Sequence, residues 1–228
     1  ADREAFLQGQ LTSDVRLASA GRALPTAGLS PKGKLIFAGK LAAVDDRLRL
    51  VLPARLRENV LAHLKKYAVF QKVALEDRSL DFVRFGIIGA FPASTAREVS
   101  LGRDGEFEDD RLVAASGAEE FTRALDAAGG RALDPVEAEA LRVAAGRARF
   151  GQDYDESNLP DEVGMQDAIS TTKGCYVGQE IVARLRTYGR VNRRLVGFRF
   201  PDGPIPEGSL LDLAGTAADP ARRPERAP

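Results

Sequence analysis

Hydrophobic and polar positions follow recognisable periods along the N-terminal part of the chain. Residues 4–11 predict a short helix. Two extended runs, Gly21–Leu29 and Lys34–Val44, predict strands that are joined by a turn over residues 30–33. Residues Arg47–Leu52 alternate charged and apolar side chains, which is typical of a half-buried strand. The pattern therefore predicts a helix followed by three strands.

An amphipathic pattern begins at Pro53 and predicts a second helix. His63 lies on the flank of this helix, and we expect it at the surface. Two further strands are predicted at Val69–Leu75 and Leu80–Ile88. The apolar positions that share one face of the helix are Leu56, Val60, Leu61, Leu64 and Tyr67.

Residues 92–110 are polar and contain glycine, and they are predicted to separate two halves of the chain. A strand is predicted at Arg111–Ala115 and a helix at Ala118–Ala128. A further helix is predicted to begin at Asp134 and Pro135, since Asp favours the cap and Pro the first turn.

The C-terminal part reads as an acidic irregular segment, a helix, a strand and a tail. The predicted ranges are 150–167, 178–188, Arg194–Phe200 and Ala214–Pro228, the last of which we expect to be disordered. Helices and strands interleave along the chain without a regular strand–helix–strand repeat. This order predicts an α+β fold rather than a doubly wound sheet.

Composition excludes several classes of protein. The 33 basic and 33 acidic residues balance, so the chain as a whole is not a polyanion binder. One cysteine excludes an internal disulfide, and one histidine and one methionine exclude a metal site built from soft or imidazole ligands. Apolar runs fall far short of the ~20 residues that cross a bilayer, and no leader is visible. We therefore predict a cytoplasmic protein that neither spans nor binds a membrane and holds no resident metal.

The octapeptide Lys173–Glu180, with the sequence KGCYVGQE, is the strongest candidate for chemistry. Gly174 and Gly178 flank Cys175, so the backbone there can adopt conformations that other residues avoid. A helix is predicted to begin near Gly178, and the positive end of a helix dipole stabilises a thiolate. Residues 168–200 contain seven basic residues and one acidic residue, which would add to this effect. A thiol with a depressed pKa is the resulting hypothesis.

Each of these features also has a simpler interpretation. A lone cysteine is often a small buried hydrophobe without chemistry. The basic run is either the solvated face of a helix and strand or a groove for phosphate, RNA or a glutamate tail. An acidic loop is usually only solvated, so the following carboxylates receive no catalytic role: Asp153, Asp155, Glu156, Asp161 and Glu162.

The octapeptide resembles the K-G-C-Y-x-G-Q-E signature of the YgfZ-type folate-binding family, whose relatives include the aminomethyltransferases of the glycine-cleavage system. The resemblance extends over about residues 4–200. The other matching stretches, in the order of the family, are Phe6–Val15, Lys66–Val73, Arg142–Gly146, Asn158–Pro160 and Arg193–Gly197.

This resemblance implies interlocked α+β subdomains around a central folate cavity, followed by a small β-barrel. Residues 1–200 would form the folate-binding region, with two halves that meet near 92–110, and residues 201–228 a barrel remnant and tail. The implied cofactor is tetrahydrofolate or a derivative. The implied partners are iron–sulfur client or assembly proteins, with tRNA as a further candidate.

The implied site has a functional thiol and a pterin slot. Cys175 would act as an acceptor, a redox site or a transient cluster ligand, Lys173 would tune its charge, and Gln179 and Glu180 would cap the helix or position the thiol. A flat pterin needs apolar or aromatic walls, and its glutamate tail needs a basic mouth. Candidates for stacking are Tyr67, Phe70, Tyr176 and Tyr188, and those for the basic mouth are Arg184, Arg186 and Arg190.

The chain also departs from the aminomethyltransferase pattern. Phe37 and Ala38 stand where those enzymes carry an acidic pair, so the aminomethyl-transfer reaction is not expected. Ala144 stands where they tend to carry a glutamate, and the chain has no tryptophan. The preferred hypothesis is a folate-binding accessory protein for iron–sulfur cluster assembly or repair. A tetrahydrofolate-dependent one-carbon transferase, a tRNA-modification factor and an inert binding scaffold remain as alternatives.

Overall fold

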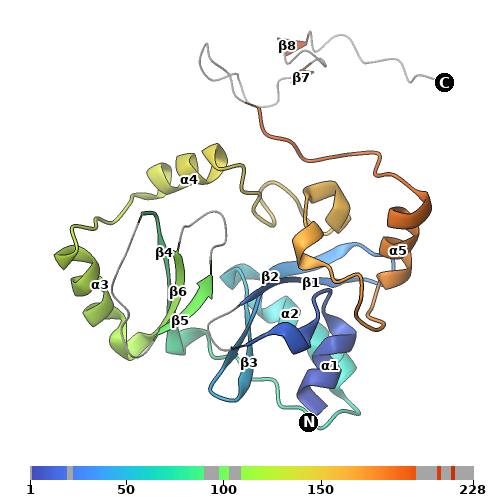
Figure 1. Ribbon diagram of the computed structural model, residues 1–228, viewed down its shortest axis with the longest axis horizontal. Coiled ribbons are helices and arrows are strands. Elements are labelled where there is room, and N and C mark those ends of the chain that lie inside the picture. Colours follow the sequence, from blue (N-terminus) through green and yellow to red (C-terminus); the bar gives the residue numbers. More distant parts are fainter. Residues whose placement is uncertain are drawn as a thin grey trace. The chain divides into compact units, whose positions relative to one another are not determined.

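The computed structural model describes residues 2–19, 23–89, 98–102, 109–198, 210–211 and 217–218 (Figure 1). The chain divides into two compact units, Ala1–Leu195 and Val196–Pro228. The first unit mixes helices with two antiparallel sheets, so the predicted α+β class is confirmed. The interlocked subdomains and the barrel remnant stay predictions.

The first sheet is the predicted three-stranded unit, in the order β1 (Leu24–Leu29), β2 (Leu35–Val44) and β3 (Arg47–Val51). The predicted turn between β1 and β2 is closed by hydrogen bonds from the Gly33 amide to the Ser30 carbonyl and from the Ser30 amide to the Lys34 carbonyl, both of 2.8 Å. Gly33 has a φ of 72°, which explains why a glycine stands at the end of this turn.

Two helices pack against the first sheet and form the main core with it (Figure 1). They are α1 (Asp2–Gln10) and α2 (Arg57–Ala68), the latter preceded by the 3₁₀ turn η2 (Ala54–Leu56); η1 (Val15–Leu17) follows α1. The predicted apolar stripe of α2 is largely confirmed, because Leu56, Val60 and Leu64 are buried. His63 is half-buried beside the Tyr67 ring, with 5.1 Å between the ring centroids.

The second sheet has the order β4 (Phe82–Ile87), β6 (Asp109–Ala114) and β5 (Glu98–Gly102). The strand β5 lies inside the stretch predicted to separate two halves, and it pairs with β6. The helices α3 (Ala118–Ala127) and α4 (Pro135–Ala144) follow, with η3 (Ser79–Asp81) and η4 (Ala115–Gly117) at the sheet ends. Asp134 caps α4 through the amides of Val136 and Glu137, as its sequence predicts.

A buried ion cluster connects the two sheets. The Asp110 side chain on β6 is fully buried and accepts a hydrogen bond of 2.8 Å from Lys40 Nζ on β2. Its two oxygens also accept from Arg84 Nε and Nη2 on β4, both at 2.9 Å. Three charged side chains therefore hold the two sheets together where their apolar contact is small, with Ala42 and Leu112 at its centre.

Two predicted strands are wrong. Residues 69–75 form a turn followed by irregular chain, and residues 194–198 of the predicted strand Arg194–Phe200 are also irregular. Val69–Leu75 is rich in apolar residues and Arg194–Phe200 alternates in polarity, but a strand also needs a neighbour for its backbone hydrogen bonds, which local sequence cannot supply. Val69 and Phe70 are accordingly 69% and 96% exposed.

The acidic segment 150–167 is irregular, as predicted, and contains the 3₁₀ turns η5 (Pro160–Val163) and η6 (Gln166–Ala168). The helix α5 (Gln179–Tyr188) follows it. In the second unit, β7 (Leu210–Leu211) pairs with β8 (Ala217–Ala218), and most of the predicted tail lies outside the described residues. None of the described helices has the length and apolar character that a membrane span requires.

Candidate functional site at the exposed cysteine

Cys175 lies in an irregular loop immediately before α5, and its side chain is exposed. The two side chains nearest in the loop behave differently, since Lys173 is 5% exposed and Tyr176 is 7% exposed. The loop is therefore anchored in the protein on both sides of a thiol that faces solvent. The burial that the simpler interpretation expects for this cysteine is therefore wrong, and the reactivity of the thiol stays a prediction.

Lys173 points into the protein, which the sequence does not predict. Its Nζ donates to three backbone carbonyl oxygens, those of Gln8 at 2.7 Å, Leu11 at 2.6 Å and Ser13 at 2.9 Å. The ammonium also lies 5.0 Å from the centroid of the Tyr176 ring. Burial lowers the pKa of Lys173 to about 8, because a charged ammonium loses its water there.

The residues after the thiol are held by backbone hydrogen bonds. The Val177 amide donates to the Gly9 carbonyl at 3.1 Å. The Tyr176 amide donates to Oε1 of Gln179, and the Gln179 amide donates to the Tyr176 carbonyl, both at 3.2 Å. Burial raises the pKa of the Tyr176 hydroxyl, so this ring remains neutral in its pocket.

Gly178 is the residue that turns the chain from the loop into α5. It has a φ of 83°, and a Cβ atom there would lie 2.5 Å from the Ser30 carbonyl oxygen and 2.9 Å from Leu29 Cβ. Gly178 is the N-cap of α5, as expected from the sequence. Gly174 differs, because a Cβ atom there would meet nothing within 4 Å.

An open hollow of about 420 Å³ adjoins the cysteine loop. Its charged groups are Glu4 and Arg16, and Gly174 forms the side next to Cys175. Arg16 also hydrogen-bonds to Asp14 through both guanidinium and backbone, which holds the pKa of that carboxyl well below its usual range. The full lining is Glu4, Ala5, Gln8, Arg16 and Gly174.

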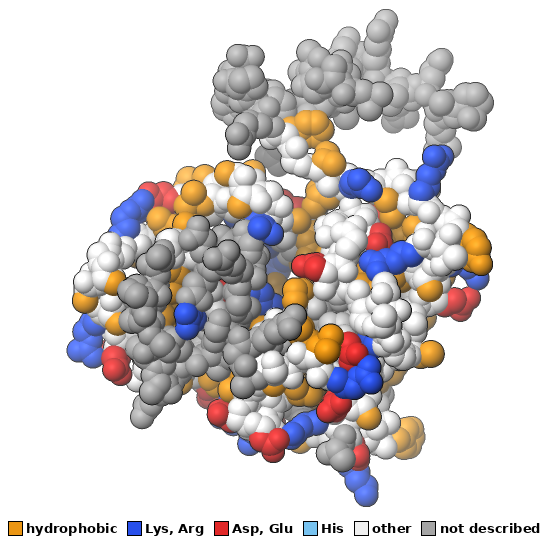
Figure 2. All heavy atoms as spheres, viewed as in Figure 1, with side chains coloured by type: hydrophobic (Ala, Val, Ile, Leu, Met, Phe, Trp, Pro, Cys, Tyr) orange, Lys and Arg blue, Asp and Glu red, His pale blue; other side chains and the backbone are white. Residues whose placement is uncertain are grey.

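The predicted basic mouth is largely paired with carboxylates. Arg184 lies 3.1 Å from Glu180, and Arg186 lies 3.0 Å from Asp161. On the face seen in Figure 2, basic and acidic side chains are interspersed rather than gathered by sign. Arg190 is exposed. Glu180 is a local partner within α5, whereas Asp161 of the acidic segment pairs with Arg186 over 25 residues, which local sequence does not reveal.

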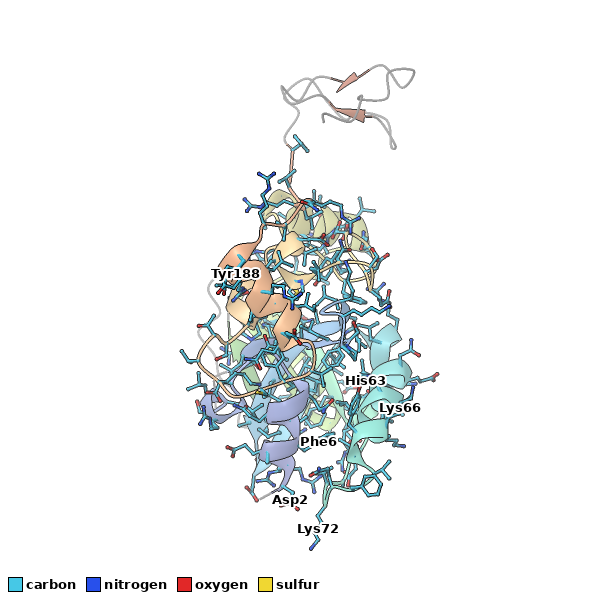
Figure 3. The ribbon with its side chains drawn as sticks, turned by 90° about the vertical axis from the view of Figure 1, so that its right-hand side faces the viewer. Asp2, Phe6, His63, Lys66, Lys72 and Tyr188 are labelled. Carbon is cyan, nitrogen blue, oxygen red and sulfur yellow. The ribbon has the colours of Figure 1, made fainter. Side chains whose placement is uncertain are left out.

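The aromatic candidates do not meet in one place. Phe70 and Tyr188 are 96% and 89% exposed, and Tyr67 is 40% exposed. Tyr67 lies in the last turn of α2 and Phe70 in the turn after it, whereas Tyr188 is the last residue of α5. Figure 3 shows Tyr188 well separated from His63 and Lys66 of α2. The predicted contact of these aromatic side chains with a pterin stays a prediction.

Of the positions that depart from the aminomethyltransferase pattern, two lie in the core and one lies on the surface. Phe37 is fully buried on β2 and Ala38 is 8% exposed, so both belong to the core. Ala144 ends α4 on an exposed surface. The neighbouring Arg142 is buried and pairs with Glu139 and Asp153.

Thr12 is a buried residue that the sequence analysis did not single out. Its hydroxyl donates to the Ala168 carbonyl at 2.6 Å and accepts from the Ala27 amide at 2.9 Å. The Ser170 amide donates to the Thr12 carbonyl at 2.9 Å. Thr12 therefore ties the segment before the octapeptide to β1, and its only signal was its place in the stretch Phe6–Val15 that matches the family.

The described residues contain no group of three or more histidine, cysteine, aspartate or glutamate side chains that could hold a metal ion. The site offers one exposed thiol, an adjacent open hollow with Glu4 and Arg16 in its lining, and a loop held by hydrogen bonds to α1.

Comparisons with known proteins agree with the resemblance in the octapeptide. No family model matches the chain. An uncharacterised protein of Haemophilus influenzae is 32% identical over 203 residues, which cover 87% of this chain and 68% of that protein. The tRNA-modifying protein YgfZ of Yersinia pestis is 30% identical over 215 residues, which cover 86% of this chain and 65% of that protein.

The chain thus spans about two thirds of the length of these two relatives. A solved structure of the glycine cleavage system aminomethyltransferase T from Bartonella henselae superposes with a TM-score of 0.64 and 17% identity, over 83% of this chain and 60% of that one. The fold is therefore aminomethyltransferase-like. The chain belongs to the YgfZ-type family, which shares this fold with the glycine-cleavage T proteins.

Proposed function

We propose that this protein is a folate-binding accessory factor that supports iron–sulfur cluster assembly or repair, and through it tRNA modification, by means of the Cys175 thiol. The observation that carries the proposal is the exposed thiol between the buried anchors Lys173 and Tyr176. A loop that served only to connect η6 and α5 would not need two anchored side chains around a solvent-facing sulfur.

Four further observations support the proposal. The relative from Yersinia pestis is named a tRNA-modifying protein, and the fold is that of an aminomethyltransferase. The octapeptide is intact, and the hollow beside Gly174 is roomy enough for a reacting group. One thiol cannot hold a cluster alone, because clusters normally take four ligands. An iron–sulfur client or assembly protein, or a small thiol, would supply the others.

Cellular complementation tests the role of the thiol. Cells that lack the protein would receive the wild-type gene, Cys175→Ser or the matched control Thr172→Ala, an exposed position in the same loop. We expect the wild type and Thr172→Ala to restore the activity of a cluster-dependent tRNA-modifying enzyme, and Cys175→Ser to fail. Full activity with Cys175→Ser would contradict the proposal.

Folate binding has a separate test. A ligand at 100 times its Kd stabilises the folded state by about 2.7 kcal/mol, so saturating tetrahydrofolate should raise the thermal unfolding temperature. Cys175→Ser should show the same shift, because the thiol is not expected to hold the pterin. An unchanged unfolding temperature across millimolar tetrahydrofolate would remove folate from the proposal.

A tetrahydrofolate-dependent one-carbon transferase is the second candidate, which the aminomethyltransferase-like fold favours. Phe37 and Ala38 argue against it, because buried apolar side chains there offer no carboxylate to handle an amine. Folate-dependent turnover of an amine or tRNA substrate would restore this candidate.

A further inference from the structure

We propose that Lys173 is a positioning residue whose ammonium clamps the cysteine loop onto the end of α1 and so fixes where the Cys175 thiol is presented. This inference rests on the proposed function of Cys175 for its biological meaning. The contacts themselves do not depend on it.

The clamp uses the full donor capacity of one ammonium. A lysine ammonium has three N–H donors, and Lys173 Nζ has three carbonyl acceptors at 2.6–2.9 Å. The acceptors belong to Gln8, Leu11 and Ser13, more than 150 residues away in sequence. With the side chain 5% exposed, water cannot easily replace any of these bonds, so releasing one leaves a buried polar group unpaired.

The position of the clamp on α1 also has a physical reason. The last carbonyls of a helix have no partner within the helix, and they carry partial negative charge. Lys173 Nζ donates a hydrogen bond to the Gln8 carbonyl, and the Val177 amide donates one to the Gly9 carbonyl at 3.1 Å. The loop is therefore attached to the last turn of α1 two residues before and two residues after Cys175.

The clamp also fixes one wall of the hollow beside the thiol. Gln8 and Gly174 both line that hollow, and Lys173 bonds to the backbone of Gln8 while it is joined covalently to Gly174. Lys173, together with the Val177 amide on the other side of the thiol, therefore sets the separation of α1 from the loop and with it the approach to Cys175.

The geometry predicts that a guanidinium cannot replace the ammonium. Three carbonyls that converge on one point match a compact ammonium, whereas the donors of arginine are spread over a planar fork. If Lys173 acted on the thiol through its charge alone, Lys173→Arg would behave like the wild type. If it acts by position, Lys173→Arg and Lys173→Met should fail alike.

The test measures amide hydrogen exchange at Val177 and the rate at which neutral iodoacetamide alkylates Cys175. We expect exchange at Val177 to become about tenfold faster or more in both variants, because hydrogen bonds to charged groups are among the stronger ones. The alkylation rate should depart from that of the wild type in the same two variants. The amide of Val113, in the second sheet, reports global unfolding, and Lys65→Met and Lys65→Arg on the exposed face of α2 are the matched controls.

Chemical rescue keeps the test decisive if the variants unfold. In Lys173→Ala, ethylammonium should bind between the carbonyls of Gln8, Leu11 and Ser13 and restore the protection of the Val177 amide from hydrogen exchange. Tetramethylammonium, which has no N–H donor, should not. Wild-type protection in Lys173→Met, wild-type behaviour of Lys173→Arg, or no rescue by ethylammonium would each overturn the inference. In Cys175→Ser, Val177 should stay protected, so a failure of the proposed function would leave the clamp result intact.

Discussion

Gly33 and Gly178 pack against each other with no room for a side chain on either residue. A Cβ atom on Gly178 would lie 3.3 Å from Gly33 Cα, and one on Gly33 would lie 2.8 Å from Ile181 Cβ. The turn between β1 and β2 therefore sits directly on the first turn of α5, where the cysteine loop ends. Two segments about 145 residues apart in sequence meet through two glycines.

We expect Gly178→Ala to lower the free energy of unfolding by more than the cost of placing an alanine in a left-handed backbone conformation. The conformation costs about 1–2 kcal/mol for a residue other than glycine, and overpacking against Ser30 and Leu29 adds about 1–3 kcal/mol. Gly129→Ala is the matched control, because Gly129 has a φ of 82° and open space around its Cα. Urea unfolding of the two variants compares the costs, and equal losses would contradict the tight contact.

The Asp110 cluster should be the most costly ionic group to break. Removal of one partner from a buried ion pair costs about 3–5 kcal/mol, since the remaining charges stay buried. Asp110→Ala should show this loss in urea unfolding, whereas Arg3→Ala, which breaks the exposed pair with Asp46, should cost about 0–1 kcal/mol. A small loss for Asp110→Ala would mean that the two sheets do not depend on the cluster.

Acid should weaken the fold partly through Glu139. A hydrogen bond from Arg142 lowers the pKa of the Glu139 carboxyl from 4.5 to about 2. The unfolded chain binds that proton first, so the contribution of Glu139 is present above about pH 4.5 and is lost as the pH falls towards 2.

As the pH is lowered from 5 to 2, the thermal unfolding temperature should therefore fall less steeply in Glu139→Gln than in the wild type. Glu119→Gln, on the exposed face of α3, should keep the wild-type slope. Identical slopes for all three proteins would show that the ion pair with Arg142 does not form in solution.

Phe70 allows a test of the folate contacts in which the substitution itself should hardly change the stability of the protein. Its side chain is 96% exposed, so Phe70→Ala should change the free energy of unfolding by no more than about 0.5 kcal/mol. Leu64→Ala, at a buried position of α2, should cost about 2–5 kcal/mol. If Phe70 stacks on the pterin, the stabilisation by tetrahydrofolate should shrink in Phe70→Ala, and an undiminished shift would remove Phe70 from the site.

The local structure around the site follows from the sequence, but its long-range contacts do not. Gly33, the Asp134 cap and Gly178 each have a local geometric reason and stand where expected. The strand predicted at Val69–Leu75 failed because pairing depends on a neighbour elsewhere in the chain. Lys173 was expected to act on the thiol, and its real acceptors are carbonyls whose proximity only the folded chain creates.

The presence of one cysteine in the chain has a practical consequence for finding its partners. No second cysteine among these 228 residues can pair with Cys175, and the exposed position leaves the thiol accessible to a second protein. A covalent complex captured under oxidising conditions would therefore appear as a new band on a non-reducing gel and disappear with dithiothreitol. Mass spectrometry of that band would identify both the client protein and the cysteine through which it is joined to Cys175.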